Sequence, residues 1–436
     1  MPADKPREVE PPGGDRPASA GAADEGLSSL LRRGVKAAIA RWAVRRRGEP
    51  EIWPRPQDEA PHPWDGRRHF AEDYTFAAVQ PELALIARVE WLPGREAHRV
   101  WLTLLTPDAV YALPGTGQAL LRGGGDHWRA GGVALDCTEP LRAWTVRYRG
   151  RLEVRDPRGH RRRPARDDLP AEDLEVRVDL TFVSQVPTFV PGRDDDPDLV
   201  SRQIGAAEWD ARLLKQLRRN SLRSYVQPGE VHGSIALGNQ LLAFGGAGLR
   251  HHGWGVRDWG ASDSALQCLV SLPGAHGPAG AHGQGGAHGP AGAHGPGGAH
   301  GPAGAHGQGG AHGQGGAYGP AGAQAGPLRA WVHTAQFPWL RLAGGFVQRA
   351  AGVVPIRDLG VAPTRRPDRA PSHVGLHIDA PGGALELEAE TLSELALDMD
   401  GRGRLELALC RVHGAGAGWA LMIHQQRLLP RVQPSP

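Results

Sequence analysis

From about residue 66 onward, apolar side chains recur in short runs or at every second position, separated by turns rich in glycine and proline. Residues 144–148 are apolar at alternate positions, and residues 174–180 repeat this pattern. Alternation with period two is typical of a strand that buries one face. The basic segment between these two strands, residues 158–166, is expected to be a solvated hairpin tip. Further strands are predicted at 83–92, 100–105, 231–237, 240–244, 328–333, 345–350, 374–378, 384–392, 404–412 and 419–425.

Two segments have helical periodicity instead. In residues 26–47, apolar side chains recur at helical spacing, and the opposite face carries only basic charges. Such a helix can pack on the protein with its basic face in solvent, or make weak contact with an anionic membrane surface. Residues 205–223 form a second amphipathic pattern, in which Trp209, Leu213 and Leu217 share a face. We predict that this helix links two strand-rich halves.

The pattern therefore predicts a mainly β protein, with two tandem antiparallel β-barrel or sandwich domains. The strands do not alternate with helices, so a parallel sheet is not expected. We place the first domain at 66–204, the linking helix at 205–223 and the second domain at 224–430. Residues 1–25 are polar and rich in proline and glycine, and we expect a disordered tail.

A repeat interrupts the second predicted domain. Residues 275–322 hold eight copies of a hexapeptide of the form Ala-His-Gly-Pro/Gln-Ala/Gly-Gly, with tyrosine replacing histidine in the last copy. Glycine, proline and alanine bury too little surface to offset the chain entropy lost on ordering. We therefore expect a disordered, low-complexity loop. Its histidines could bind transition metals adventitiously, and we predict no functional metal site or cofactor.

Composition narrows the classes of partner. The chain has 436 residues and a formal net charge of only +3, and nearly all of its basic residues are arginine. This charge does not indicate a nucleic-acid partner. Three widely spaced cysteines form neither a CxxC motif nor a disulfide framework. The N-terminal segment has no apolar signal region, and no apolar run is long enough to span a bilayer. We expect a soluble, cytoplasmic protein.

The strongest candidate site is residues 248–259, Gly-Leu-Arg-His-His-Gly-Trp-Gly-Val-Arg-Asp-Trp. Large rings and titratable groups interspersed with glycine are typical of a backbone that bends around a fixed site. On a strand, His252 and Trp254 share one face, whereas His251 points to the other. Asp258 could accept hydrogen bonds from Arg250 or Arg257. The structural alternative is an arginine packed on tryptophan, closing one end of a barrel.

The remaining candidates are weaker. His333 lies beside Trp331 and could line the same lumen as the 248–259 segment, or be an ordinary core histidine. The glycines at 115–117 and 123–125 form neither a P-loop nor a dinucleotide-binding motif. No nucleophile elbow is present, and no catalytic triad can be recognised.

The 250–259 segment resembles a signature of the lipocalin-like superfamily that includes carotenoid 1,2-hydratase and its uncharacterised tandem-domain relatives. Three other stretches agree: Glu139-Pro-Leu-Arg-Ala-Trp144, Val178-Asp-Leu-Thr-Phe182 and Tyr225-Val-Gln-Pro-Gly229. This resemblance implies two lipocalin-like β-domains. In the hydratases, residues corresponding to His252 and Trp254 are implicated in adding water to an isolated double bond. His251 replaces the aspartate that precedes the histidine in the family signature.

Three functions follow as hypotheses. The first is binding of a hydrophobic small molecule, of lipid or isoprenoid class, within or between the barrels. His252 and Trp254 would face this ligand, with ligand-binding support from Arg250, Arg257, Asp258, Trp259 and His333. The second is a hydratase-like or isomerase-like enzyme, in which His252 and Trp254 are catalytic. An acid within hydrogen-bond reach of His252 would favour the enzyme, whereas a collapsed lumen would argue against both hypotheses. The third is a scaffold acting through the basic helix and the repeat.

Overall fold

The computed structural model describes residues 34–38, 41, 53–115, 120–122, 127–160, 173–207, 222–257, 262–273, 327–350, 352–364, 366 and 369–428. Its strands in the first half of the chain are β1 (Phe70–Gln80), β2 (Leu83–Leu92), β3 (Ala97–Leu105), β4 (Val110–Ala112), β5 (Leu120–Arg122), β6 (Arg129–Ala130), β7 (Val133–Glu139), β8 (Ala143–Arg155), β9 (Asp173–Val183), β10 (Arg223–Leu237) and β11 (Gln240–Val256). Those that follow are β12 (Ser264–Leu272), β13 (Leu328–Gln336), β14 (Arg341–Arg349), β15 (Gly352–Pro355), β16 (Asp358–Pro363), β17 (His373–Ala380), β18 (Gly383–Met399), β19 (Gly403–Gly414) and β20 (Gly418–Arg427). The helical elements are η1 (Pro56–Glu59), η2 (Pro93–Arg95) and α2 (Pro197–Ala206).

The mainly β class is confirmed. The first sheet runs β4-β3-β2-β1-β11-β10-β9-β8, and β4 also pairs with β8. This last pairing closes eight antiparallel strands into a barrel, which we call the first barrel. A barrel of eight strands is just wide enough for side chains to fill.

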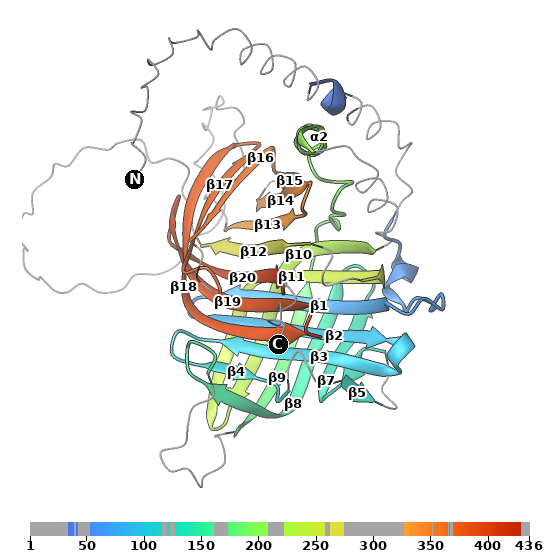
Figure 1. Ribbon diagram of the computed structural model, residues 1–436. Coiled ribbons are helices and arrows are strands. Elements are labelled where there is room, and N and C mark those ends of the chain that lie inside the picture. Colours follow the sequence, from blue (N-terminus) through green and yellow to red (C-terminus); the bar gives the residue numbers. More distant parts are fainter. Residues whose placement is uncertain are drawn as a thin grey trace, which may run out of the picture.

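The second sheet contains nine antiparallel strands in the order β15-β14-β13-β12-β20-β19-β18-β17-β16. It curves into a half-barrel that packs beside the first barrel (Figure 1). The boundary between the sheets differs from the predicted one at residue 224, because β10 and β11 complete the first barrel. Strand alternation cannot reveal which neighbour a strand pairs with, and β11 pairs with β1, far away in sequence.

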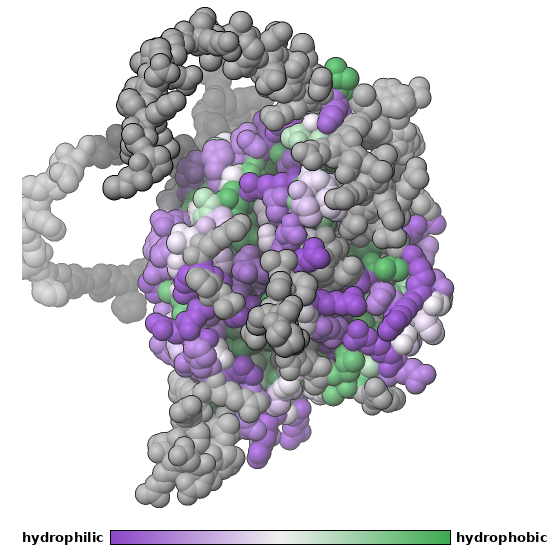
Figure 2. Space-filling view, viewed as in Figure 1, coloured by the Kyte–Doolittle hydropathy of each residue, from purple (hydrophilic) through white to green (hydrophobic). Residues whose placement is uncertain are grey.

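Apolar side chains form three large cores. One fills the first barrel, a second lines the concave face of the second sheet, and a third lies between the two sheets. Trp101 and Leu249 of the first barrel meet Leu269 and Phe346 of the second sheet in this third core. The surface seen in Figure 2 is mostly hydrophilic, with small and scattered hydrophobic areas.

The predicted linking helix, residues 205–223, lies mostly outside the described residues. The described helix at this point is α2, which runs from Pro197 to Ala206 and begins before the predicted range. Its start follows from local chemistry, because the Asp196 carboxylate caps the backbone amides of Asp198 and Leu199, each at 2.9 Å. Proline then occupies the first turn, where no intrahelical N–H bond is lost. The apolar positions that suggested a later helix, from 209 onward, lie outside the described residues.

Part of the predicted basic helix is seen, since residues 34–38 and 41 are helical. Lys36 donates a hydrogen bond to the carbonyl of Ala207 at 3.1 Å, and Arg41 pairs with Asp198 at 2.8 Å. These contacts favour packing on α2, the first of the two alternatives for this segment. No helix in the described part of the chain is long and apolar enough to cross a membrane.

The predicted hairpin of residues 144–154 and 174–183 is confirmed by the pairing of β8 with β9. Most of its basic tip lies outside the described residues, as do the N-terminal tail and the 275–322 repeat. The repeat connects β12 to β13, which pair with each other up to Leu272 and Leu328. It is therefore an insertion into the turn of a hairpin.

Candidate functional site

One end of the first barrel holds a buried polar network. Arg250, His252 and Trp254 occupy alternate positions of β11 and are all buried. The sequence predicted the shared face of His252 and Trp254. Facing them is the segment 53–69, which precedes β1 and contains η1. We call this segment the strap, because it lies across the barrel end and places Glu59 and His62 inside the network.

The deepest part of the network is an ion pair between Arg250 and Glu59, both buried. The same carboxylate accepts a hydrogen bond from the Trp144 indole at 2.8 Å and from the Tyr225 hydroxyl at 2.5 Å. The second guanidinium nitrogen of Arg250 donates to the side-chain oxygen of Gln227 at 2.6 Å. Burial acts to lower the pKa of Arg250, but Tyr225 and Glu59 outweigh it and hold that pKa above its usual value.

Aromatic rings surround this charge. The Arg250 guanidinium carbon lies 5.5–6.0 Å from the ring centroids of Tyr74, Trp144, Phe182 and Tyr225. Such cation–π contacts help to offset the loss of hydration. All four sequence stretches that carry the family resemblance therefore meet at this point, through Trp144, Phe182, Tyr225 and Arg250.

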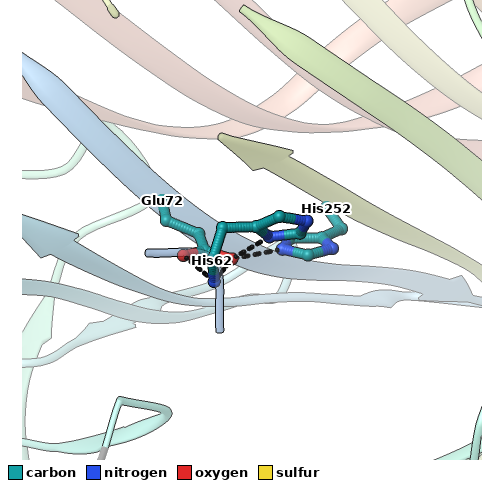
Figure 3. Close-up of side chains that lie close together, drawn as sticks. All are labelled: His62, Glu72 and His252. Atoms are coloured by element: carbon teal, nitrogen blue, oxygen red, sulfur yellow. Dashed lines mark hydrogen bonds and ion pairs between the residues drawn. The ribbon is translucent and has the colours of Figure 1, made fainter. Parts of the chain in front are cut away.

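Above the ion pair, Glu72 of β1 joins two histidines (Figure 3). His252 Nε2 lies 3.0 Å from Glu72 Oε1, and His62 Nδ1 lies 2.8 Å from the same oxygen. The backbone amide of His62 donates to the other carboxylate oxygen at 2.9 Å. Burial acts to raise the pKa of Glu72, but the hydrogen bonds from His252 and His62 outweigh it and lower the pKa below its usual value. Burial lowers the pKa of His252.

The hydrogen bonds of the network need one more proton than its neutral side chains supply. Tyr225 lies between Glu59 Oε1, at 2.5 Å, and His252 Nδ1, at 3.2 Å. Three contacts in a row, from Glu59 through Tyr225 and His252 to Glu72, each need one hydrogen. A tyrosine and a neutral histidine supply only two. With the carboxylates ionised, one further proton on His252 completes the chain, and the longer contact to Tyr225 lacks a hydrogen when His252 is neutral.

The same three side chains were considered as metal ligands. Two imidazoles and one carboxylate are a known donor set for zinc, and their ligand atoms lie within 4.8 Å of one another. With bonds of about 2.0–2.1 Å, tetrahedral zinc would hold its ligands about 3.3 Å apart. The separations of 2.8 and 3.0 Å are those of hydrogen bonds. In the described geometry the cluster is a hydrogen-bonded acid–base group that can take up one proton.

Aromatic rings lie along the outer edge of the network. The His62 ring stacks on Trp254 with centroids 3.8 Å apart, and Trp53 lies 5.5 Å from Trp254. The other face of the network is the Tyr74 ring, stacked on His252 at 3.9 Å. His252 is fully buried, whereas the His62 side chain is 19% exposed. His62 is thus the link between the buried acid–base groups and solvent.

The ligand lumen was expected within or between the two β-domains. Side chains fill the first barrel, and the third core fills the space between the sheets. Bulky rings such as Phe76, Trp144 and Phe182 pack where a ligand would lie. Among the described residues that contact His252, His62 is partly exposed, so the strap side is the side on which His252 lies nearest to solvent.

Arg257 serves a different network on the outer face of β1 and β2. It pairs with Asp73 and, at 3.0 Å, with Glu90. Arg99 bridges Glu90, at 2.9 Å, to Asp400 of the second sheet, at 2.7 Å. This arrangement ties the two sheets together, and Arg257 is not part of the His252 network.

His333 is also placed elsewhere. It stacks on Trp331 with centroids 4.7 Å apart and lies 3.5 Å from Asp195, against the second sheet. The expectation that it shares a lumen with His252 is therefore wrong. The residues beside His333 in the sequence do not indicate which part of the molecule its face of the sheet packs against. Asp258 and Trp259 lie outside the described residues.

Sequence reasoning missed Glu59, His62 and Glu72. Glu72 is an acid within hydrogen-bond reach of His252, because β1 and β11 are neighbours in register, with Glu72 opposite Trp254. Alternation along β1 puts Glu72 and Tyr74 on one face, which was a usable signal. Only the closed sheet brings that face to His252.

This chain is similar to one protein family and to several solved structures. The sequence profile of a domain of unknown function, DUF7064, matches residues 55–277, from the strap through the first barrel to β12. The chain belongs to this family. The comparison with curated proteins gave no match.

Three solved structures were among those found. An AttH-like protein from Nitrosomonas europaea is 13% identical, with 87% of this chain and 97% of that chain covered and a TM-score of 0.42. CghA with Sch210972 is 10% identical, with 83% and 89% covered and a TM-score of 0.41. Kievitone hydratase from Nectria haematococca is 8% identical, with 83% and 89% covered and a TM-score of 0.39.

Proposed function

We propose that the protein is an acid–base enzyme of hydratase or isomerase type, acting on an unsaturated, apolar small molecule at the strap end of the first barrel. The observation that carries this proposal is the buried pair of His252 and Glu72, 3.0 Å apart beneath Trp254. A histidine whose pKa is lowered by burial is a stronger acid once protonated. Such an acid suits proton transfer to a weakly basic double bond.

The reaction would proceed in two steps that balance. Protonated His252 gives its proton to one alkene carbon, and the adjacent carbon becomes a cation next to the Trp254 and Tyr74 rings. In hydration, water then adds to this cation and returns one proton to the Glu72–His252 pair. In isomerisation, the cation instead loses a proton from a different carbon. Both routes restore the resting enzyme.

Access to the pair requires the strap to move. Glu59 and His62 both come from this segment, so its displacement would expose His252 and Trp254 together. The packed interior of the first barrel argues against a ligand deep inside it, so the ligand-binding hypothesis and the enzyme hypothesis are both placed here, beneath the strap. The proton held between Glu72 and His252 distinguishes them, since simple binding of an apolar molecule has no use for a buried acid–base pair.

The test incubates the full chain with a cell lipid extract in D₂O and follows product masses. Hydration adds 20 mass units and isomerisation adds one, because the transferred hydrogen is deuterium. We expect this change with the wild type and its loss in Glu72→Gln and His252→Gln. His232→Gln, on the same barrel but outside the network, is the matched control.

Native mass spectrometry of the same samples separates binding from turnover. A bound mass that disappears in Trp254→Ala, without any deuterated product, would leave a binding protein and contradict the enzyme. Product formation that survives in both network variants would move the chemistry to another part of the chain.

A further inference from the structure

The concave face of the second sheet contains a cavity that the proposed reaction does not use. It measures about 730 Å³ and lies at the end of the sheet where β12 begins and β20 ends. Pockets that hold small molecules are usually about 300–1,000 Å³. The first barrel is filled by aromatic rings at the corresponding place, whereas here the apolar core stops short of the rim.

Apolar and charged side chains divide the lining. Leu266 of β12 and Val361 of β16 extend the core of the second sheet into the cavity, and Pro363 continues this surface. The charged residues of the lining are Arg341, Arg366, Arg369, Arg427, His424 and Asp263. Basic groups therefore outnumber acidic ones on the wall.

Two buried carboxylates lie behind this wall. Glu394 accepts a hydrogen bond from Arg366 at 3.0 Å, and Arg369 lies 3.9 Å away from it. Two guanidinium groups thus share one carboxylate. The second, Glu406, is already matched by Arg404 at 3.1 Å and by His424 at 2.8 Å.

The remaining positive charge faces the cavity. Arg341 is exposed and forms no ion pair with any described residue, and Arg427 lies 3.7 Å from Asp263 at the rim. Among the described residues, four lining arginines are therefore set against two carboxylates, Asp263 and Glu394. Arginine is suited to binding carboxylate or phosphate oxygens in a planar, bidentate geometry.

We propose that this cavity binds a small organic anion with an apolar body. Its charged oxygens would meet Arg341, Arg366 and Arg369, and its apolar part would lie on Leu266 and Val361. A carboxylate and a phosphate monoester share the required chemistry. This site is separate from the His252 network and does not rest on the proposed reaction.

The test measures binding to the full chain by isothermal titration calorimetry with three probes of equal chain length: decanoate, decyl phosphate and decanol. We expect decanoate or decyl phosphate to bind at least tenfold more tightly than decanol, and added salt to weaken the anion. The stronger of the two anions identifies the head group. Equal binding of decanol and both anions would overturn the proposal.

Three variants locate the site. Arg341→Gln should weaken the anion about fivefold or more without changing decanol, and it breaks no ion pair between described residues. Glu394→Gln should strengthen the anion, because it removes a carboxylate that competes for Arg366 and Arg369. A purely structural role would not give opposite signs for these two changes. Val361→Trp should reduce binding of all three probes by filling the cavity.

Arg151→Gln, on an exposed position of β8 in the first barrel, is the control for a general loss of positive charge. If it weakens the anion as much as Arg341→Gln does, binding is non-specific and the proposal is wrong. Unchanged affinity in all three cavity variants would also overturn it. Turnover by the His252 network is measured separately, so failure of one proposal leaves the other to its own test.

Discussion

The strap end of the first barrel and the cavity of the second sheet both place arginine and glutamate inside a curved sheet, with opposite results. In the first barrel, Glu59 enters from the strap and is shared by Arg250, Trp144 and Tyr225. In the second sheet, Glu394 is shared by two arginines that are each 34% exposed. An arginine–glutamate ion pair is therefore fully buried in the first barrel, whereas in the second sheet its arginines line an open cavity.

This contrast shows how burial changes the use of a charge. A fully buried charge must have its hydrogen-bond partners within the protein, since leaving it unpaired costs several kcal/mol. A half-exposed arginine keeps its hydration and can exchange a carboxylate for a ligand. We therefore expect mutations at the strap end to act mainly on stability, and mutations at the cavity to act mainly on binding.

The largest effect should come from breaking the Arg250–Glu59 pair. Glu59→Ala leaves Arg250 buried without its carboxylate and should lower the free energy of unfolding by about 3–5 kcal/mol. Glu394→Ala, the matched change in the second sheet, should cost about 1 kcal/mol or less, because solvent screens its arginines. Urea denaturation measures both. Equal costs would contradict the contrast between the two regions.

A smaller loss of stability is expected when the hydrogen bond donated by Trp144 is removed. Trp144→Phe removes the N–H donated to the Glu59 carboxylate, and the lost charged hydrogen bond should cost about 1.5–3 kcal/mol. The control is Trp331→Phe, since the buried Trp331 N–H forms no hydrogen bond with a described residue. Comparable losses in the two variants would show that ring volume, and not the bond to Glu59, accounts for the effect.

The pH dependence of stability should reveal the lowered pKa of His252 in the folded protein. In the unfolded chain a histidine binds a proton near pH 6.5, whereas burial keeps the folded His252 neutral to lower pH. The unfolded state therefore binds more protons, and stability should fall as the pH drops below about 6.5, by about 1.4 kcal/mol per unit of pKa difference. His252→Gln should flatten this slope when urea midpoints are compared between pH 7.5 and 5.5.

His98 gives the control for that experiment, because burial also lowers its pKa but it lies outside the network. His98→Gln should remove only its own share of the slope and leave deuterium transfer unchanged. If Glu72 instead held His252 in its charged form, His252→Gln would change the slope in the opposite direction. A slope that His252→Gln leaves unaffected would mean that His252 binds its proton equally well in the folded and unfolded states, contrary to the prediction.

The smallest effect should come from removing the repeat. Replacing residues 275–322 by an Asn-Gly turn shortens the β12–β13 connection, and lower loop entropy should stabilise the protein by at most about 2 kcal/mol. The cavity is lined by Ser264 and Gln336 at the other end of this hairpin, so decanoate affinity should stay within twofold. A loss of affinity would mean that the repeat contributes to the second-sheet site.

The sequence alone was enough to predict the β class, most of the strands and the shared face of His252 and Trp254. These depend on the period of two along a strand, which is a local property. The same local period also predicted the β8–β9 hairpin. The boundary at residue 224 was wrong, because pairing with β1 places β11, and β10 with it, in the first barrel. Helix α2 was not predicted, and most of the helix predicted at 205–223 lies outside the described residues.

Only the tertiary structure decided the chemistry of the two sites. Glu59, His62 and Glu72 lie far from His252 in sequence, and closure of the barrel with the strap across its end brings them together. The same closure packs side chains inside the first barrel, whereas the second sheet stays open and has a cavity at one end. Strand pairing over long sequence separations sets which side chains meet, and no local pattern of residues contains that information.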